Sequence, residues 1–260
     1  MSALAITSAA NPRIKAARAL WLRKTRQESG LFLAEGLKII GEALAAGRAP
    51  KTLIYAAETA GHPIFEAAAA AAGERLQVSP SLLAKISKRD NPQLALGVFE
   101  AVTTPLEQLD PAAAPAFIAL EGVRDPGNLG AIVRTADAAG AGAVVLVGET
   151  CDPFSVEAVR ATMGSIFAVP IARASRKAFL SWRVSWPGAV VGTSLASALD
   201  YRDADWRAPV LALMGAEQSG LTPELATTCD VLVKIPMRGR ADSLNLAVAA
   251  GIVLYRAMGL

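Results

Sequence analysis

The sequence is poor in the residues that build metal sites and histidine-dependent catalytic centres. Its 260 residues include two cysteines, Cys151 and Cys229, and one histidine, His62. The cysteines stand alone without metal-ligand spacing, and His62 lies between a glycine and a proline in a predicted loop. These absences argue against a metal site and against a histidine-based catalytic triad. Two isolated thiols are typical of a reduced protein, and we expect a cytoplasmic location.

Long apolar runs and nucleotide-binding loops are also missing. No segment approaches the roughly 18 apolar residues of a membrane span, and the first residues lack the layout of a signal peptide. With 53% hydrophobic and 19% charged residues, the composition indicates a globular protein with a large core and no membrane partner. There is no Walker-A loop, and the nearest Gly-x-Gly candidate, at 140–142, precedes a predicted strand. Nucleotide hydrolysis and a Rossmann-type dinucleotide site are therefore disfavoured.

The net charge of +3 says little, but the charges are unevenly placed. Residues 13–26 contain six basic side chains and no acidic one: Arg13, Lys15, Arg18, Arg23, Lys24 and Arg26. Such a cluster can neutralise several phosphates of a nucleic acid. A solvated helix face explains the same charges, so both interpretations stay open on charge alone.

The sequence divides into three parts. Residues 1–105 predict one small α/β domain, in which a helix opens at Asn11-Pro12 and short apolar strands alternate with helices. The proline- and alanine-rich stretch 106–115 predicts a linker. Residues 116–260 alternate strand and helix, and apolar runs without period-two alternation predict a buried parallel sheet in an open doubly wound fold. The predicted strands are 117–120, 144–147, 190–192, 210–213 and 231–235.

A first chemical motif follows the strand at 117–120. The sequence EGVRDPGNLG, residues 121–130, turns through proline and glycine and enters a helix that carries Arg134. Open α/β sheets bind ligands at such strand ends, and Asn128 and Arg134 are spaced nearly two helical turns apart, so both can project to one side. A helix cap for Asn128 and a surface cation for Arg134 are the structural alternatives.

A second motif follows the strand at 210–213. In MGAEQSGL, residues 214–221, Gly215 and Gly220 allow close approach of backbone to a ligand, and Glu217 lies between them. Two glycines in a loop are weak evidence, whereas the form G-x-E-x-x-G-L after a buried strand is more specific.

A third motif, IPMRGRADSLNLAVAA, occupies residues 235–250. Pro236 ends the preceding strand, a polar loop follows, and Ser243 is the predicted N-cap of a helix that is apolar on all sides. Asn245 stands out, because a buried amide needs hydrogen-bond partners or costs a few kcal/mol. A capped core helix is the structural alternative.

In order and spacing, the three motifs resemble those of the SpoU (TrmH-like) RNA 2′-O-ribose methyltransferases. The resemblance implies a C-terminal α/β trefoil-knot domain that binds S-adenosylmethionine and forms a homodimer. The pattern NPRIKAARALWLRKTRQESGLFLAEG, residues 11–36, is similar to the smaller N-terminal α/β RNA-binding domain of that family. There we expect Arg23, Lys24 and Arg26 to contact RNA phosphates and Glu35 to be structural.

The resemblance also implies residue roles. The catalytic set would be Asn128, Arg134, Glu217, Ser243 and Asn245, and the cofactor would be held near Thr193, Gly215, Ile235 and Leu244. In the family the equivalent of Arg134 lies at the reacting ribose hydroxyl. Since a guanidinium has a pKa above about 12, positioning and charge stabilisation suit it better than proton abstraction. Two departures, Ala247 in place of a frequent serine and Arg256 in place of glutamate, concern the periphery.

Ribosomal RNA is the favoured substrate, with tRNA as the alternative. A protein of this fold that binds RNA or assists ribosome assembly without catalysis is the other hypothesis. The chain retains the polar positions that such a loss would be free to erase, so an active enzyme is favoured.

Overall fold

The computed structural model describes residues 4–260, which form two compact units. The N-terminal unit extends to Val102 and also contains Asp152–Ala168, and the C-terminal unit comprises Thr103–Cys151 and Val169–Leu260. This division differs from the predicted boundaries (1–105, 106–115 and 116–260) in one respect that matters. A segment in the middle of the predicted C-terminal domain packs with the N-terminal unit.

The predicted linker is also part of a folded unit. Leu106 and Leu109, in and just after a 3-10 turn at Leu106–Gln108, are buried in the core of the C-terminal unit. A second 3-10 turn spans Pro111–Ala113. The prolines suggested a tether, but the two leucines between them dock this stretch on the sheet.

The N-terminal unit is built around a mixed five-stranded sheet of order β1-β4-β3-β5-β2. Strands β1, β4 and β3 run parallel to one another, and β5 runs antiparallel to both β3 and β2. The strands are β1 (Leu4–Ala5), β2 (Leu31–Glu35), β3 (Thr52–Tyr55), β4 (Glu74–Gln77) and β5 (Ala95–Glu100). The helices are α1 (Pro12–Ala19), α2 (Arg23–Ser29), α3 (Leu37–Ala45), α4 (Pro63–Ala71), α5 (Pro80–Ser87) and α7 (Val156–Thr162), with 3-10 turns at Ala57–Thr59 and Ser165–Phe167.

The helix predicted from Asn11 begins as expected. The side chain of Asn11 accepts a hydrogen bond from the backbone N–H of Arg13, and Pro12 occupies the first helical position. The basic stretch is nevertheless two helices, because α1 ends at Ala19 and α2 starts at Arg23. The bend between them has a direct consequence for Arg26.

Arg26 is buried, and this corrects its predicted role as a phosphate ligand. Its side chain is 6% exposed and pairs with Asp152, 7% exposed, at an Nη2–Oδ2 distance of 2.7 Å. Its Nη1 also donates to the carbonyl oxygens of Leu20 and Trp21, at 2.8 and 3.0 Å. The guanidinium is therefore fully engaged in contacts inside the unit, where its ion pair with Asp152 links the Asp152–Ala168 segment to α2.

A second ion pair anchors the same segment. Arg160 of α7 donates to Oε2 of Glu35 at 2.6 Å and to the carbonyl of Ser87 at 3.0 Å. Burial raises the pKa of Glu35 above its usual value, and the nearby Arg160 opposes that rise. The expectation that Glu35 is structural agrees with this position.

The C-terminal unit confirms the predicted parallel α/β sheet. Six strands pair in the order β11-β9-β10-β6-β7-β8, and every neighbouring pair is parallel. They are β6 (Ala116–Glu121), β7 (Val144–Val147), β8 (Ile171–Ala174), β9 (Val190–Thr193), β10 (Val210–Met214) and β11 (Val231–Val233). The sequence missed β8, a short edge strand whose third residue is the exposed Arg173. The helices are α6 (Pro126–Ala139), α8 (Arg176–Arg183), α9 (Pro223–Ala226) and α10 (Leu246–Ala257).

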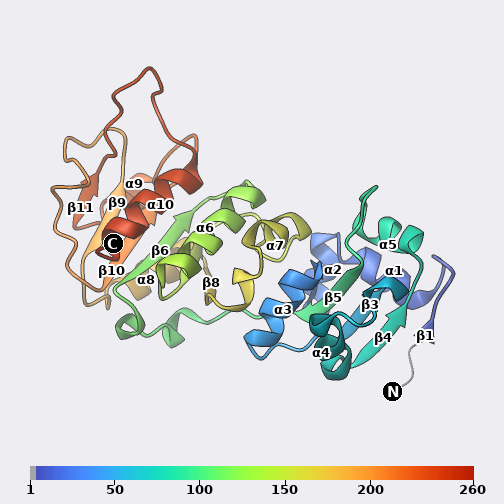
Figure 1. Cartoon of the computed structure of the whole chain (residues 1–260). Coiled ribbons are helices and arrows are strands. Elements are labelled where there is room, and N and C mark those ends of the chain that lie inside the picture. Colours follow the sequence, from blue (N-terminus) through green and yellow to red (C-terminus); the bar gives the residue numbers. More distant parts are fainter. Residues whose placement is uncertain (1–3) are drawn as a thin grey trace. The chain divides into compact units, whose positions relative to one another are not determined.

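Helices cover both faces of this sheet. On one face α10 lies along α6 and over β6 and β10 (Figure 1). On the other, the Phe117 ring of β6 meets Trp186 edge-on, with centroids 5.1 Å apart, in a core that also contains Phe179 of α8. Among residues 4–260 no helix is long and apolar enough to cross a membrane.

The strand order brings distant loops together. The chain builds β6, β7 and β8 outward, then returns to place β10 directly beside β6. Met214 at the end of β10 is in register with Leu120 near the end of β6. The first two motifs therefore leave adjacent strand ends, at the point where open α/β sheets bind ligands.

Candidate active site

The first motif places Asn128 in the opening turn of α6. Asp125 is the N-cap, and its Oδ1 accepts from the backbone N–H of Asn128 at 2.6 Å, while Pro126 occupies the first helical position. Capping by Asp125 leaves the side chain of Asn128 available for other contacts. The simple cap interpretation of Asn128 is therefore wrong.

The side chain of Asn128 joins all three motifs. Its Nδ2 donates to Oε1 of Glu217 at 3.0 Å, and its Oδ1 accepts from Nδ2 of Asn245 at 2.9 Å. These residues are 89 and 117 positions away in sequence. The structure thus assembles a hydrogen-bonded row, Glu217–Asn128–Asn245, from the ends of β6 and β10 and the start of α10.

Asn245, and not Ser243, is the N-cap of α10, which corrects the sequence prediction. Its Oδ1 accepts from the backbone N–H groups of Ala247 and Val248, at 2.9 and 3.3 Å. This use of the oxygen leaves the two N–H donors of the amide free for Asn128. The partners that an amide here requires are therefore present, and helix and network fix the same side chain from two directions.

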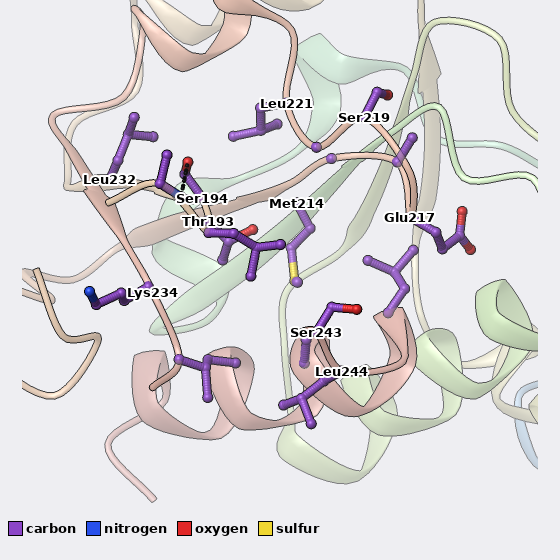
Figure 2. A pocket seen from close by; sticks show the side chains of 18 of the residues that line it. Thr193, Ser194, Met214, Glu217, Ser219, Leu221, Leu232, Lys234, Ser243 and Leu244 are labelled. Atoms are coloured by element: carbon purple, nitrogen blue, oxygen red, sulfur yellow. Dashed lines mark hydrogen bonds between the residues drawn. The ribbon is translucent and has the colours of Figure 1, made fainter. Parts of the chain in front are cut away.

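A cavity of about 360 Å³ lies beside this network. It is lined by the four residues predicted to hold the cofactor, Thr193, Gly215, Ile235 and Leu244, and by Glu217 and Ser243 of the predicted catalytic set. Figure 2 shows Met214 in the middle of the cavity, between Thr193 and the Ser243–Leu244 turn. Leu221, Leu232 and Leu246 supply further apolar wall.

The two glycines of the second motif serve the loop itself. A Cβ on Gly215 would lie 1.9 Å from the backbone carbon of Gly220, so no side chain fits there. Gly220 has φ +66°, in the left-handed region that favours glycine, and exchanges backbone hydrogen bonds with Ala216. The close backbone approach predicted at Gly215 is an approach to its own chain, which holds Glu217 at the cavity rim.

The remaining predicted residues are exposed. Arg134 lies on α6, and its guanidinium makes no hydrogen bond or ion pair with any part of the chain that the structure describes. Ser243 contacts Asp242 at 3.4 Å. On the N-terminal unit Arg23 is exposed, and Lys24 pairs loosely with Glu28 at 3.8 Å.

Sequence reasoning missed several cavity residues. Met214, Lys234 and Met237 line the cavity, and each directly precedes or follows a residue that the motifs singled out. Ser194 and Leu195 come from the loop after β9, where the sequence had no motif beyond Thr193. Within residues 4–260 no group of three metal-ligating side chains lies together. Fold and site together define an α/β protein with a cavity of small-ligand size beside a polar network.

Two family models match the chain. The model of the SpoU rRNA Methylase family matches residues 115–255, and that of the MRM3-like substrate binding domain matches residues 11–97. The chain belongs to the SpoU rRNA methylase family.

Named relatives span the whole length of the chain. It is 31% identical over 254 residues to the 23S rRNA (guanosine(2553)-2′-O)-methyltransferase RlmP of Bacillus subtilis, covering 98% of this chain and 99% of that protein. It is 32% identical to the 23S rRNA (uridine(2479)-2′-O)-methyltransferase of Streptomyces viridochromogenes, covering 91% and 85%. The crystal structure of AdoMet-bound rRNA methyltransferase from Sinorhizobium meliloti has a TM-score of 0.91 and 48% identity, covering 97% and 96%.

Proposed function

We propose that this protein methylates the 2′-hydroxyl of a ribose in ribosomal RNA, with S-adenosylmethionine as methyl donor. The observation that carries the proposal is the Glu217–Asn128–Asn245 network beside the 360 Å³ cavity. Family membership and relatives named as 23S rRNA 2′-O-methyltransferases support it.

The residues present fit the cofactor. A volume of about 360 Å³ is within the range of small-ligand sites, roughly 300–1,000 Å³. Leucine and methionine walls suit an adenine ring, and the backbone groups of Thr193, Gly215, Ile235 and Leu244 are the polar partners we assign to adenine and ribose. When bound, S-adenosylmethionine supplies an electrophilic methyl group on a positively charged sulfur.

The residues around the cavity then have distinct roles. A ribose hydroxyl is a poor nucleophile at neutral pH, so its developing negative charge needs stabilisation. Arg134, exposed and unpaired within residues 4–260, is the cation we assign to that charge or to the adjoining phosphate. Ser243 at the cavity wall orients the ribose, and Glu217, Asn128 and Asn245 hold the motif loops in register.

Two features of the C-terminal unit belong to the same proposal. We assign a trefoil knot to the chain between β11 and α10, because the last loop must return from an edge strand to pack α10 on α6 and bring Asn245 to Asn128 (Figure 1). We also assign a homodimer. Leu244, just before α10, and Val248 and Tyr255 on it are 37%, 52% and 41% exposed, an apolar surface that a second copy would cover. A monomer by light scattering at micromolar concentration would contradict the dimer.

The N-terminal unit is the RNA-binding domain in this proposal. Its assignment rests on the match to the MRM3-like substrate binding domain and on exposed basic residues such as Arg23 and Lys24. A substrate in ribosomal RNA also places the enzyme in the cytoplasm. No membrane role is assigned.

The test is transfer of labelled methyl from S-adenosylmethionine to separated ribosomal RNA and tRNA, isolated from a strain that lacks the gene. Label in ribosomal RNA, recovered as a 2′-O-methylnucleoside, is the expected result. Label in tRNA alone would keep the chemistry and refute the substrate. Cofactor binding absent together with transfer would favour a catalytically inactive RNA-binding or ribosome-assembly protein.

A further inference from the structure

A second, larger cavity opens on the C-terminal unit next to the proposed cofactor site. Its volume is about 670 Å³, and it lies at the carboxyl ends of β6, β7 and β8. The residues that matter for its chemistry are Glu121, Arg124, Glu149, Arg173, Arg176 and Thr222. None of the residues assigned above to catalysis or to the cofactor's adenine and ribose lines this larger cavity.

The two cavities share one wall. Ala216, Ser219 and Gly220 of the second motif line both. The cofactor cavity lies on the β9–β10–β11 side of that loop, and the larger one on the β6–β7–β8 side. A ligand in the larger cavity would therefore lie beside the bound cofactor without occupying its place.

A buried carboxylate holds the shared wall in position. Glu121, 6% exposed at the end of β6, accepts from the backbone N–H and Oγ1 of Thr222, at 2.8 and 3.0 Å. It also accepts from Nε of Arg176 at 3.0 Å, and the Arg176 Nη2 lies 2.9 Å from the same oxygen. Arg176 is thus neutralised by Glu121, with Glu224 3.8 Å away as a second partner. It forms part of the wall and leaves little charge for a ligand.

Two other arginines are available. Arg124, in the loop after β6, and Arg173, near the end of β8, are both exposed. Neither guanidinium has a hydrogen bond or ion pair within the described range 4–260. The opposing group in the cavity is Glu149, an exposed carboxylate that likewise has no ion pair within that range. Two free cations against one free anion leave a net positive, wide and solvent-accessible site.

We propose that this cavity binds the phosphodiester backbone of the RNA substrate, through Arg124 and Arg173, at nucleotides next to the target nucleotide. The inference rests on the proposed RNA methylation and adds a substrate subsite to it. Guanidinium groups bind phosphate oxygens in a bidentate manner, and two of them at the ends of β6 and β8, with β7 between these strands, suit two phosphates of one backbone better than one small anion. Arg124 also lies four residues before Asn128, in the loop that leads into α6, so RNA held here passes close to the network.

The test compares the wild-type protein with Arg124→Ala/Arg173→Ala, using in-vitro transcribed 23S rRNA as probe. Each lost phosphate contact lowers affinity by about 5- to 8-fold at 0.1 M salt and reduces the slope of log K against log salt by about 0.7–0.9. The double variant should therefore bind the RNA roughly 25- to 60-fold more weakly, with a slope smaller by about 1.4–1.8. Its dissociation constant for S-adenosylmethionine should equal that of wild type.

Two further variants sharpen the comparison. Glu149→Gln removes the opposing charge and should tighten RNA binding. Arg207→Ala is the matched control, because Arg207 is exposed and precedes β10, at the amino ends of the parallel strands, whereas the cavity lies at their carboxyl ends. It should change neither affinity nor salt slope.

The outcomes separate the subsite from the proposed function. An unchanged affinity and slope in the double variant overturns the subsite, as does a loss of cofactor binding, which would assign the cavity to the cofactor. Wild-type protein that binds the RNA through these arginines yet transfers no methyl keeps the subsite and refutes the proposed reaction. Wild-type protein that does not bind the RNA refutes both.

Discussion

Replacing Arg26 by methionine should destabilise the N-terminal unit without directly weakening phosphate binding. The pair with Asp152 is 6% and 7% exposed, so the change leaves a buried carboxylate without its counter-charge. Breaking such a pair from one side costs about 3–5 kcal/mol, far above the 0–1 kcal/mol of an exposed pair. For a chain of this size each kcal/mol lowers the melting temperature by about 2–4 °C, so a fall of at least about 6 °C is expected.

Two comparisons isolate the cause. Lys24→Met, at a side chain 85% exposed with one 3.8 Å partner, should alter stability by no more than about 0.5 kcal/mol. Adding Asp152→Asn to Arg26→Met keeps the Oδ1 acceptor for the backbone N–H of Phe154 and removes the orphaned charge, so stability should partly return. Urea unfolding gives the free energies, and hydrogen exchange should speed up in residues 20–35 and 152–168. If Arg26→Met is as stable as Lys24→Met and loses one unit of RNA salt slope, Arg26 binds phosphate and the buried pair is wrong.

The other predictions concern the site and one thiol. Asn128→Ala removes the link between Glu217 and Asn245 and should slow labelled methyl transfer by about 100-fold, roughly 2.7 kcal/mol, with cofactor affinity by calorimetry nearly unchanged; equal turnover would refute the network's role. Gly215→Ala forces a Cβ to 1.9 Å from Gly220 and should abolish cofactor binding, which equilibrium dialysis measures. Burial raises the pKa of Cys229 from 9.0 to about 12, so the native thiol keeps a proton that the unfolded chain loses in that window. The free energy of unfolding should therefore fall as pH rises from about 9 to 12, and Cys229→Ala, unfolded in urea at several pH values, should show a shallower fall.

Much of the C-terminal unit was predictable because its signals are local. Uninterrupted apolar runs marked five of six strands, and the run at 144–147 matches β7 residue for residue. Strand β8 was missed because Arg173 interrupts its apolar run. An edge strand has one side exposed and therefore tolerates such a charge. The third motif singled out Asn245, but the N-cap was assigned to Ser243, because Ser and Asn are equally good N-caps and the sequence does not show which of them caps the helix.

Contacts between distant segments were beyond sequence patterns. Charge clustering cannot tell Arg23 from Arg26, since the distinction depends on Asp152, 126 residues away. The same holds for the Asp152–Ala168 segment, whose helix is ordinary in sequence and whose attachment to the N-terminal unit is made by Arg26 and by the Glu35–Arg160 pair. Long-range ion pairs of this kind have no periodic trace along the chain.

The most direct test of the central claim compares ribosomal RNA from a strain that lacks the gene with RNA from the same strain complemented by wild type or by Arg134→Ala. A 2′-O-methyl group removes the hydroxyl that drives alkaline cleavage, so the modified nucleotide is protected from hydrolysis. The account predicts one protected nucleotide that appears with wild type and is absent with Arg134→Ala, although that variant still binds the cofactor. Identical cleavage patterns in all three RNAs, or protection restored by Arg134→Ala, would contradict it.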